Sequence, residues 1–414
     1  MSRLQAEHLY KVFGRRPADA VERLRHGADR EELRAEGTTA AVIDASFTVE
    51  PGQIFVVMGL SGSGKSTLLR MLNGLSEPTA GQVLFDGQDL TGLSPRELRE
   101  VRSKKISMVF QHFALFPHRS VLENAAYGLE VQGLPRAERE KRATEALELA
   151  GLKGWEKSWP DELSGGMQQR VGLARALATD ADLLLMDESF SALDPLIRRD
   201  MQDQLLELQK TLKKTIVFIT HDLNEAMRLG DQIAVMRDGR IVQTGTAEDI
   251  LVTPANDYVA AFTQDVDRSR VLTAGAIMAD PETAYGTTTP DGKELHTAAD
   301  VLAAAPATVS ADTPIIELFT PCSTSGVAVA VTDEGGALIG VVPRARLLAV
   351  LGEPSTQQEA APNAAVPAQV RDADRGPDKS GKGAGKDAGK DDVEGARRAG
   401  SDGGKSVGKV SSGA

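Results

Sequence analysis

Gly59-Leu60-Ser61-Gly62-Ser63-Gly64-Lys65-Ser66-Thr67 is the stretch that decides the fold of this chain. It follows the apolar run 54–58 and precedes the mainly apolar segment 68–72, so the order predicts a buried strand, a glycine-rich loop and a helix starting at Lys65. Successive backbone N–H groups of such a loop point at one anion, and the positive end of the helix dipole faces the same anion. A plain glycine-rich turn before a helix is the alternative, but the spacing favours a loop that binds nucleotide phosphates.

Two side chains of this loop are expected to contact the nucleotide and its metal. In loops of this type the Lys65 ammonium reaches the β- and γ-phosphates, and the Ser66 hydroxyl becomes a ligand of Mg²⁺. Thr67 adds a second hydroxyl at the start of the helix. The sequence therefore predicts a nucleotide site that uses Mg²⁺.

A pair of carboxylates, Asp187 and Glu188, follows the apolar run 183–186. A buried strand would deliver both acids to the carboxyl edge of the sheet, where the phosphate loop is also expected. We assign Asp187 to Mg²⁺, and Glu188 to orienting and deprotonating the attacking water. Acidic residues after a strand are also common helix caps, but the phosphate loop upstream favours catalysis.

A second glycine-rich stretch, Ser164-Gly165-Gly166-Met167-Gln168, also begins a helix. Ser164 is a good N-cap, which is the structural interpretation. Paired glycines cost a helix roughly 1 kcal/mol each, however, so something should approach their bare N–H groups closely. A second anion at this helix start is the functional interpretation.

This stretch resembles the signature sequence of ABC ATPases, and the resemblance covers residues 1 to about 265. It implies that Gln111 contacts Mg²⁺ and relays to a membrane subunit, that His221 contacts the γ-phosphate, and that Phe13 stacks on adenine. It places Asp194 in the D-loop, 191–194. Taken singly, Gln111, His221 and Phe13 have structural alternatives as a strand-end polar residue, a satisfied histidine and a core aromatic, but their order and spacing favour the functional roles.

In this family two such domains meet head to tail and enclose two ATP molecules. Each nucleotide lies between the phosphate loop of one chain and the signature residues of the other. The resemblance therefore implies a homodimer in which Ser164, Gly165, Gly166 and Gln168 face the partner's γ-phosphate, and it explains the second anion inferred above.

Three segments, 58–67, 111–118 and 190–198, together with the insert after Gly14, are similar to the ATP-binding subunit of glycine betaine/L-proline importers. This implies a motor on the cytoplasmic face of the membrane, bound near 111–127 to permease subunits and served indirectly by an external substrate-binding protein. Cargo rests on resemblance alone, so choline, methionine or another amino acid stays open. A soluble ABC ATPase acting on ribosomes or DNA is the other alternative, although those proteins usually join two ATPase halves.

Composition narrows the class of protein. A net charge of −12 argues against a general nucleic-acid binder, and we expect no nucleic-acid partner. A basic stretch at 96–105 is best explained as a solvated helix face. The single cysteine, Cys322, excludes an internal disulfide and fits a reducing cytoplasm. No run of about 18 apolar residues is present to span a bilayer.

The predicted fold class is α/β. Residues 1–265 are expected to form a P-loop NTPase (ABC ATPase) domain with a helical subdomain, in which 112–150 is mostly helical and 15–39 contains one or two short exposed helices. Residues 266–352 contain a CBS-like α/β region whose first repeat is degenerate, either a sensor of ionic strength or nucleotide or a structural cap. Residues 353–414 are too polar to form a core and are expected to be disordered.

Overall fold

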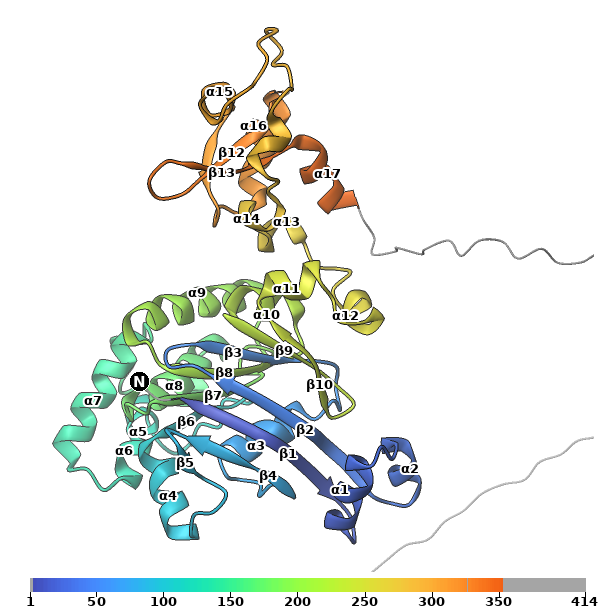
Figure 1. Ribbon diagram of the computed structural model, residues 1–414. Helices are drawn as coiled ribbons and strands as arrows, with labels where there is room; N and C mark the ends of the chain where they lie inside the picture. Colours follow the sequence, from blue (N-terminus) through green and yellow to red (C-terminus); the bar gives the residue numbers. More distant parts are fainter. Residues whose placement is uncertain (1–2, 326, 353–414) are drawn as a thin grey trace, which may run out of the picture. The chain divides into compact units, whose positions relative to one another are not determined.

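The computed structural model describes residues 3–325 and 327–352, so the tail expected to be disordered lies outside the described residues. Its elements form three sheets (Figure 1). Within these described ranges no helix combines the length and the apolar character that a membrane span requires.

The largest sheet has six strands in the order β10-β9-β3-β8-β7-β6. All neighbouring strands run parallel except β10, which is antiparallel to β9. The strands are β3 (Ile54–Met58), β6 (Ile106–Val109), β7 (Leu183–Asp187), β8 (Thr215–Thr220), β9 (Gln232–Arg237) and β10 (Arg240–Gly245). This arrangement confirms the predicted α/β fold with a mostly parallel sheet.

Strand β3 is buried on both faces, because its alternate side chains enter two different cores. Ile54, Val56 and Met58 pack with the helices α8 (Gly165–Ala178), α9 (Pro195–Leu212) and α10 (Leu223–Leu229). Phe55 and Val57 pack on the other side with α3 (Lys65–Leu72), which lies between the two larger sheets in Figure 1. A strand with apolar residues on both faces is expected immediately before a phosphate loop in a parallel sheet.

The second sheet is antiparallel, in the order β2-β1-β4-β5. It consists of β1 (Leu4–Phe13), β2 (Thr39–Val49), β4 (Ala80–Phe85) and β5 (Gln88–Asp89), with β4 and β5 forming a hairpin. Helix α4 (Pro95–Lys104) follows, and none of its residues is buried, which agrees with a solvated basic face.

The insert after Phe13 forms two helices, α1 (Pro17–Arg25) and α2 (Arg30–Ala35). The prediction that they are exposed is wrong in part. Val21, Leu24 and Leu33 are buried in a small core with residues of β1 and β2. The charged residues on their outer faces conceal this narrow apolar stripe in the sequence.

The helical subdomain consists of α5 (Val121–Ala125), α6 (Tyr127–Val131), α7 (Arg136–Leu149) and α8, which share one apolar core. The prediction that 112–150 is mostly helical is confirmed for the part that begins at Val121, whereas 112–120 is a loop. The fully buried amide of Asn124 holds this loop, since it accepts from Phe116 N at 2.8 Å and donates to the carbonyl oxygens of Phe116, Arg119 and Ser120. These bonds satisfy backbone groups that a helix would otherwise pair internally.

Residues beyond the largest sheet begin with α11 (Ala247–Val252) and α12 (Asp257–Phe262), then the short helices α13 (Arg268–Val271), α14 (Ala274–Ile277) and α15 (Ala298–Ala304). A three-stranded sheet follows, of β11 (Thr308–Ser310), β12 (Val329–Thr332) and β13 (Leu338–Val342), with α16 (Phe319–Thr324) and α17 (Arg344–Gly352). The order after 307 is strand, helix, hairpin, helix. Its assignment to the CBS family stays a prediction.

Candidate functional site

Parallel register brings the predicted motifs to one edge of the largest sheet. Met58 pairs with Thr220, and Asp187 pairs with Ile219, so β3, β7 and β8 end side by side. The phosphate loop follows β3, Glu188 follows β7, and His221 follows β8. The carboxyl edge of the sheet is therefore the site that the sequence predicts.

Close packing requires two glycines of the phosphate loop. A Cβ atom on Gly59 would lie 2.2 Å from the carbonyl oxygen of Met236, and one on Gly64 would lie 2.2 Å from that of Ala41. Gly64 also has φ 105°, a left-handed conformation that starts α3 at Lys65 as predicted. The loop is held further by a bond from Gly239 N to Ser63 O, 3.0 Å long.

Lys65 lies inside the loop, with 5% of its surface exposed. Its ammonium donates to the carbonyl oxygens of Gly59 at 2.8 Å and Leu60 at 3.1 Å, and Nζ lies 4.0 Å from Oε1 of Glu188. Burial lowers the pKa of Lys65, while the carboxylates of Glu188 and Asp187 oppose that shift. The cation therefore lies on backbone carbonyls of the glycine-rich loop, where it fits the role of contacting a bound phosphate group.

Ser66 and Asp187 meet across the loop, with Ser66 Oγ donating to Oδ1 of Asp187 at 3.1 Å. Burial raises the pKa of Asp187, and the neighbouring charge of Glu188 adds to the rise. A hydroxyl and a carboxylate are hard oxygen donors of the kind Mg²⁺ prefers, and a cation beside them would offset the buried negative charge. These two residues fit the metal assigned to them.

Glu188 is held in an uncommon backbone conformation, with φ 45°. For a non-glycine residue this costs about 1–2 kcal/mol, so the surrounding structure must hold it there. Glu188 N donates to Ile219 O at 2.9 Å, which anchors the residue to β8. The strain aims the carboxylate along the carboxyl edge of the sheet, and its side chain keeps 18% exposure.

Two side chains, His221 and Gln111, contact the carboxylate of Glu188. Oε2 lies 2.9 Å from Nδ1 of His221 and 3.5 Å from Nε2 of Gln111, the second a long and weak contact. Ser191 completes the group, since Gln111 Nε2 donates to Ser191 Oγ at 3.3 Å and that hydroxyl donates to Glu188 O at 2.8 Å. The structure therefore brings together Gln111, Glu188 and His221.

Sequence reasoning placed Ser191 in the D-loop but missed its contacts with Gln111 and Glu188. The available signal was its position three residues after Glu188, which is the spacing of a tight turn. Its N–H and its hydroxyl both donate to the Glu188 carbonyl, at 3.1 Å and 2.8 Å.

The signature residues lie at the start of α8. Ser164 is its N-cap, accepting from Met167 N at 3.4 Å, and the Gln168 amide donates to the carbonyl oxygens of Pro160 and Leu163. Gly166 has an internal reason to be glycine, because a Cβ there would lie 2.4 Å from a methyl carbon of Ile197. Gly165 has no such reason, since its Cβ would meet only the Phe113 ring, at 3.5 Å.

Phe13 and Asp194 occupy the ends of their elements. Phe13 ends β1 with 50% of its surface exposed, and the Lys11 ammonium lies 5.2 Å from its ring centre. Asp194 caps α9, accepting from Ile197 N at 3.1 Å. The exposed ring leaves a face free for stacking, whereas the Asp194 carboxylate already has a structural role.

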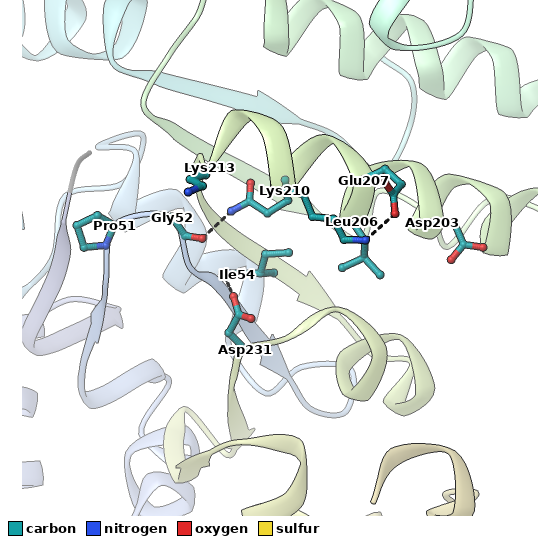
Figure 2. A pocket seen from close by; sticks show the side chains of 10 residues that line it. Pro51, Gly52, Ile54, Asp203, Leu206, Glu207, Lys210, Lys213 and Asp231 are labelled. Carbon is teal, nitrogen blue, oxygen red and sulfur yellow. Dashed lines mark hydrogen bonds and ion pairs between the residues drawn. The ribbon is translucent and has the colours of Figure 1, made fainter. Parts of the chain in front are cut away.

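A cavity of about 700 Å³ lies at the other end of the strands, where β3 begins (Figure 2). Gly52, Ile54 and Asp231 line one side of it, and the second half of α9 lines the other. Asp231 uses one carboxylate oxygen to accept from Ile54 N at 2.8 Å. Because the phosphate loop follows the opposite end of β3, this cavity is not the nucleotide site.

Comparison with known proteins agrees with this geometry. Residues 42–191 match the ABC transporter family. Glycine betaine transport ATP-binding protein OpuAA of Bacillus subtilis (strain 168) is 49% identical over 385 residues, covering 84% of this chain and 92% of the relative. Glycine betaine/proline betaine transport system ATP-binding protein ProV of Escherichia coli (strain K12) is 46% identical over 389 residues, covering 84% and 97%.

A solved structure is also similar, the dimeric post-hydrolysis state of the ATP-binding cassette MJ0796 bound to ADP and Pi. It has a TM-score of 0.50 and 31% identity, and the match covers 59% of this chain and 98% of that one. The resemblance predicted from the motifs is thus confirmed, together with the P-loop fold. The chain belongs to the ABC transporter ATP-binding proteins, which are ATPases, in the group that includes the glycine betaine transport ATP-binding proteins.

Proposed function

We propose that this chain is the ATP-hydrolysing motor subunit of an importer for compatible solutes of the glycine betaine and proline type. The observation that carries the proposal is the meeting of Lys65, Asp187 and Glu188 at one sheet edge, in a chain that aligns with 92% of a glycine betaine transport protein. No residue of the motor selects the solute. That selection belongs to the permease and to an external binding protein.

In the hydrolytic step, Glu188 accepts the proton of the attacking water, and His221 holds the carboxylate from its other side and contacts the γ-phosphate. The 2.9 Å contact between them supports this division of roles. Lys65 neutralises charge on the β- and γ-phosphates, and the N–H groups of 59–67 surround the phosphates. Phe13 stacks on the adenine, for which its exposed ring is suited.

Mg²⁺ belongs to this site in the proposal, where Ser66 and Asp187, which contact one another, would hold it, Asp187 through water. Gln111, which contacts Glu188, is the third residue assigned to the metal. When bound, the metal neutralises charge that develops on the phosphates. Asp187 needs a cation most, because its carboxylate is buried with another carboxylate close by.

The second half of each site comes from a partner copy in this proposal. Within one chain, the side-chain hydrogen bonds of Ser164 and Gln168 stay among residues 160–168, and the similar cassette is a dimer. Ser164, Gly165, Gly166 and Gln168 then face the partner's γ-phosphate, and Asp194 lies at the same contact. ATP favours the closed dimer because only that state provides both halves.

A membrane permease is the proposed partner on the cytoplasmic face. A cavity of about 510 Å³ separates β6 from the helical subdomain, and its lining includes Met108, Phe110, Tyr127 and Arg175. Phe110 in this lining directly precedes Gln111. A permease helix bound in the cavity would therefore be coupled to movement at the nucleotide. The region 266–352 is proposed as the CBS-like addition to the motor domain 1–265.

Reconstitution with the cognate permease and binding protein in proteoliposomes tests the cargo. Glycine betaine and proline should be taken up only with ATP, and the Glu188→Gln complex should take up neither. Uptake of choline or methionine alone would replace the proposed cargo while leaving the motor intact. Recovery of the chain from cells without any multi-span membrane protein would favour the soluble ABC ATPase.

A further inference from the structure

Arg198, in the first turn of α9, makes most of its hydrogen bonds to the loop that follows Glu188. It donates to three backbone carbonyl oxygens, of Phe190 at 3.2 Å, Ser191 at 3.2 Å and Leu193 at 3.1 Å. A guanidinium has five N–H donors in one rigid plane, so this single side chain can hold all three carbonyls and still reach another partner. The loop 190–193 is therefore fixed from inside by one residue.

The remaining bond of Arg198 reaches a different segment. Nη1 donates to Oδ2 of Asp222 at 3.1 Å, and Asp222 directly follows His221. The other oxygen of Asp222 caps α10 by accepting from Asn224 N at 3.0 Å and Glu225 N at 3.3 Å. One carboxylate thus joins the loop that carries His221 both to α10 and to Arg198.

The two segments that Arg198 joins carry Glu188 and His221, which contact one another and are assigned to hydrolysis at the γ-phosphate. Glu188 is strained at φ 45° and is held by Ser191, which donates its N–H and its hydroxyl to the Glu188 carbonyl. Arg198 in turn holds the carbonyl of Ser191. Its guanidinium therefore sets the spacing between the loop after Glu188 and the loop of His221.

We propose that Arg198 is a positioning residue for hydrolysis, which keeps Glu188 and His221 in register by bridging the carbonyls of 190–193 to Asp222. The inference rests on the roles proposed above for Glu188 and His221. Arg198 and Asp222 are both half-buried, with side-chain exposures of 27% and 31%, so water competes less for this pair than for a surface ion pair. Loss of the bridge should leave nucleotide binding intact and misplace the reacting groups.

Steady-state ATPase kinetics of the full-length chain test this. Arg198→Ala and Arg198→Lys should lower kcat about 10- to 100-fold, the scale expected for displacing a catalytic group by about 1 Å. KM for ATP and fluorescent-nucleotide affinity should stay within about threefold, because no phosphate-loop contact is removed. Rates are expressed per nucleotide-binding site, so that unfolded protein does not count. Arg199→Ala, an exposed neighbour on the same helix, is the matched control and should behave as wild type.

Asp222→Asn is the second variant, in case Arg198 variants fold poorly. Asparagine caps a helix as well as aspartate, so α10 is preserved while the charge partner is lost. Its kcat should also fall, and Arg198→Ala with Asp222→Asn should be no slower than Arg198→Ala alone, because both act through one bridge. Wild-type kcat in Asp222→Asn, or multiplied losses in the double variant, overturns the inference.

Glu188→Gln separates this inference from the proposed function. If Glu188→Gln abolishes turnover while Arg198→Ala and Arg198→Lys keep it, the positioning role is wrong and the proposed function stands. If Glu188→Gln turns over normally, the proposed function fails first.

Discussion

Nδ1 of His221 lies 2.9 Å from Oε2 of Glu188, although 33 residues separate them in the chain. The contact exists because β7 and β8 are adjacent parallel strands, and each ends directly before one of the two residues. The histidine therefore fixes the direction of the carboxylate within a single chain. Five experiments besides the test of Arg198 follow from this arrangement and from its surroundings.

Glu188→Gln should bind ATP and dimerise but hydrolyse at least about 100-fold more slowly, because the amide keeps the size of the side chain and cannot accept the proton. Stopped-assay phosphate release and size-exclusion chromatography with ATP measure the two properties. Glu207→Gln, in the exposed part of α9, is the control and should match wild type. Near-normal turnover in Glu188→Gln would remove Glu188 as the base.

His221→Ala should lower kcat by about 100-fold with little change in ATP affinity, since it frees the Glu188 carboxylate to rotate. Steady-state kinetics and a nucleotide titration give the two numbers separately. His8→Ala removes an exposed histidine that pairs with Asp44 on the antiparallel sheet, and it should have no effect. Equal losses of kcat in the two variants would contradict the assigned role.

Lys65→Ala should weaken ATP binding at least tenfold, because it removes the cation that already lies on the carbonyls of Gly59 and Leu60. Titration with a fluorescent nucleotide measures the affinity directly. Lys210→Ala changes a lysine at the cavity of Figure 2, at the far end of the strands, and should leave affinity unchanged. An unaltered dissociation constant in Lys65→Ala would count against the phosphate-loop assignment.

Asp187→Asn should make the nucleotide-free protein more stable, and it should reduce the stabilisation that Mg²⁺ and ATP add on binding. Burial raises the pKa of Asp187 above its ordinary 3.8, so the stability that the protonated group contributes is complete below 3.8 and is lost as pH rises through the raised pKa. At neutral pH the ionised group therefore destabilises the fold, and asparagine removes that cost while keeping a partner for Ser66.

Urea unfolding at several pH values measures the stability of the nucleotide-free protein, and thermal unfolding measures the stabilisation by Mg²⁺ and ATP. The stability gain of Asp187→Asn should be largest at neutral pH and should shrink toward the acid window, while the increase in Tm on adding Mg²⁺ and ATP should be smaller than in wild type. Asp161→Asn, an exposed carboxylate, controls for a change in net charge. A less stable nucleotide-free Asp187→Asn at neutral pH would be inconsistent with the burial argument.

The carboxyl-edge residues could be predicted from the sequence because each follows a strand directly, and parallel register then brings them together. Lys65, Asp187, Glu188 and His221 need only local motifs and this topological rule. Arg198 could not be predicted, because its partner Asp222 is 24 residues away and nothing local marks the pair.

The features that the sequence did not predict depend on contacts that local propensity does not describe. The loop 112–120 is held by the buried side chain of Asn124, which lies in the helix that follows it. Leu33 of the insert lies among charged residues yet is buried, because α2 packs on β2. Local propensity describes the outer faces of such segments, while tertiary contacts decide their conformation and burial.

Gly165→Ala and Gly166→Ala test whether the signature glycines serve a partner's phosphate or only internal packing. A Cβ at 166 would lie 2.4 Å from Ile197, so that variant should lose about 1–3 kcal/mol of unfolding free energy as α8 and α9 are forced apart. A Cβ at 165 makes only ordinary contact with Phe113 at 3.5 Å, so Gly165→Ala should fold with near wild-type stability. If the backbone N–H of Gly165 faces a γ-phosphate bound to a second copy, Gly165→Ala should still lower turnover and ATP-dependent dimerisation. Denaturant unfolding, ATPase assays and sedimentation with ATP separate the two effects. A Gly165→Ala protein that dimerises and hydrolyses like wild type would contradict the contact with the partner's phosphate and leave internal packing as the explanation for Gly166 alone.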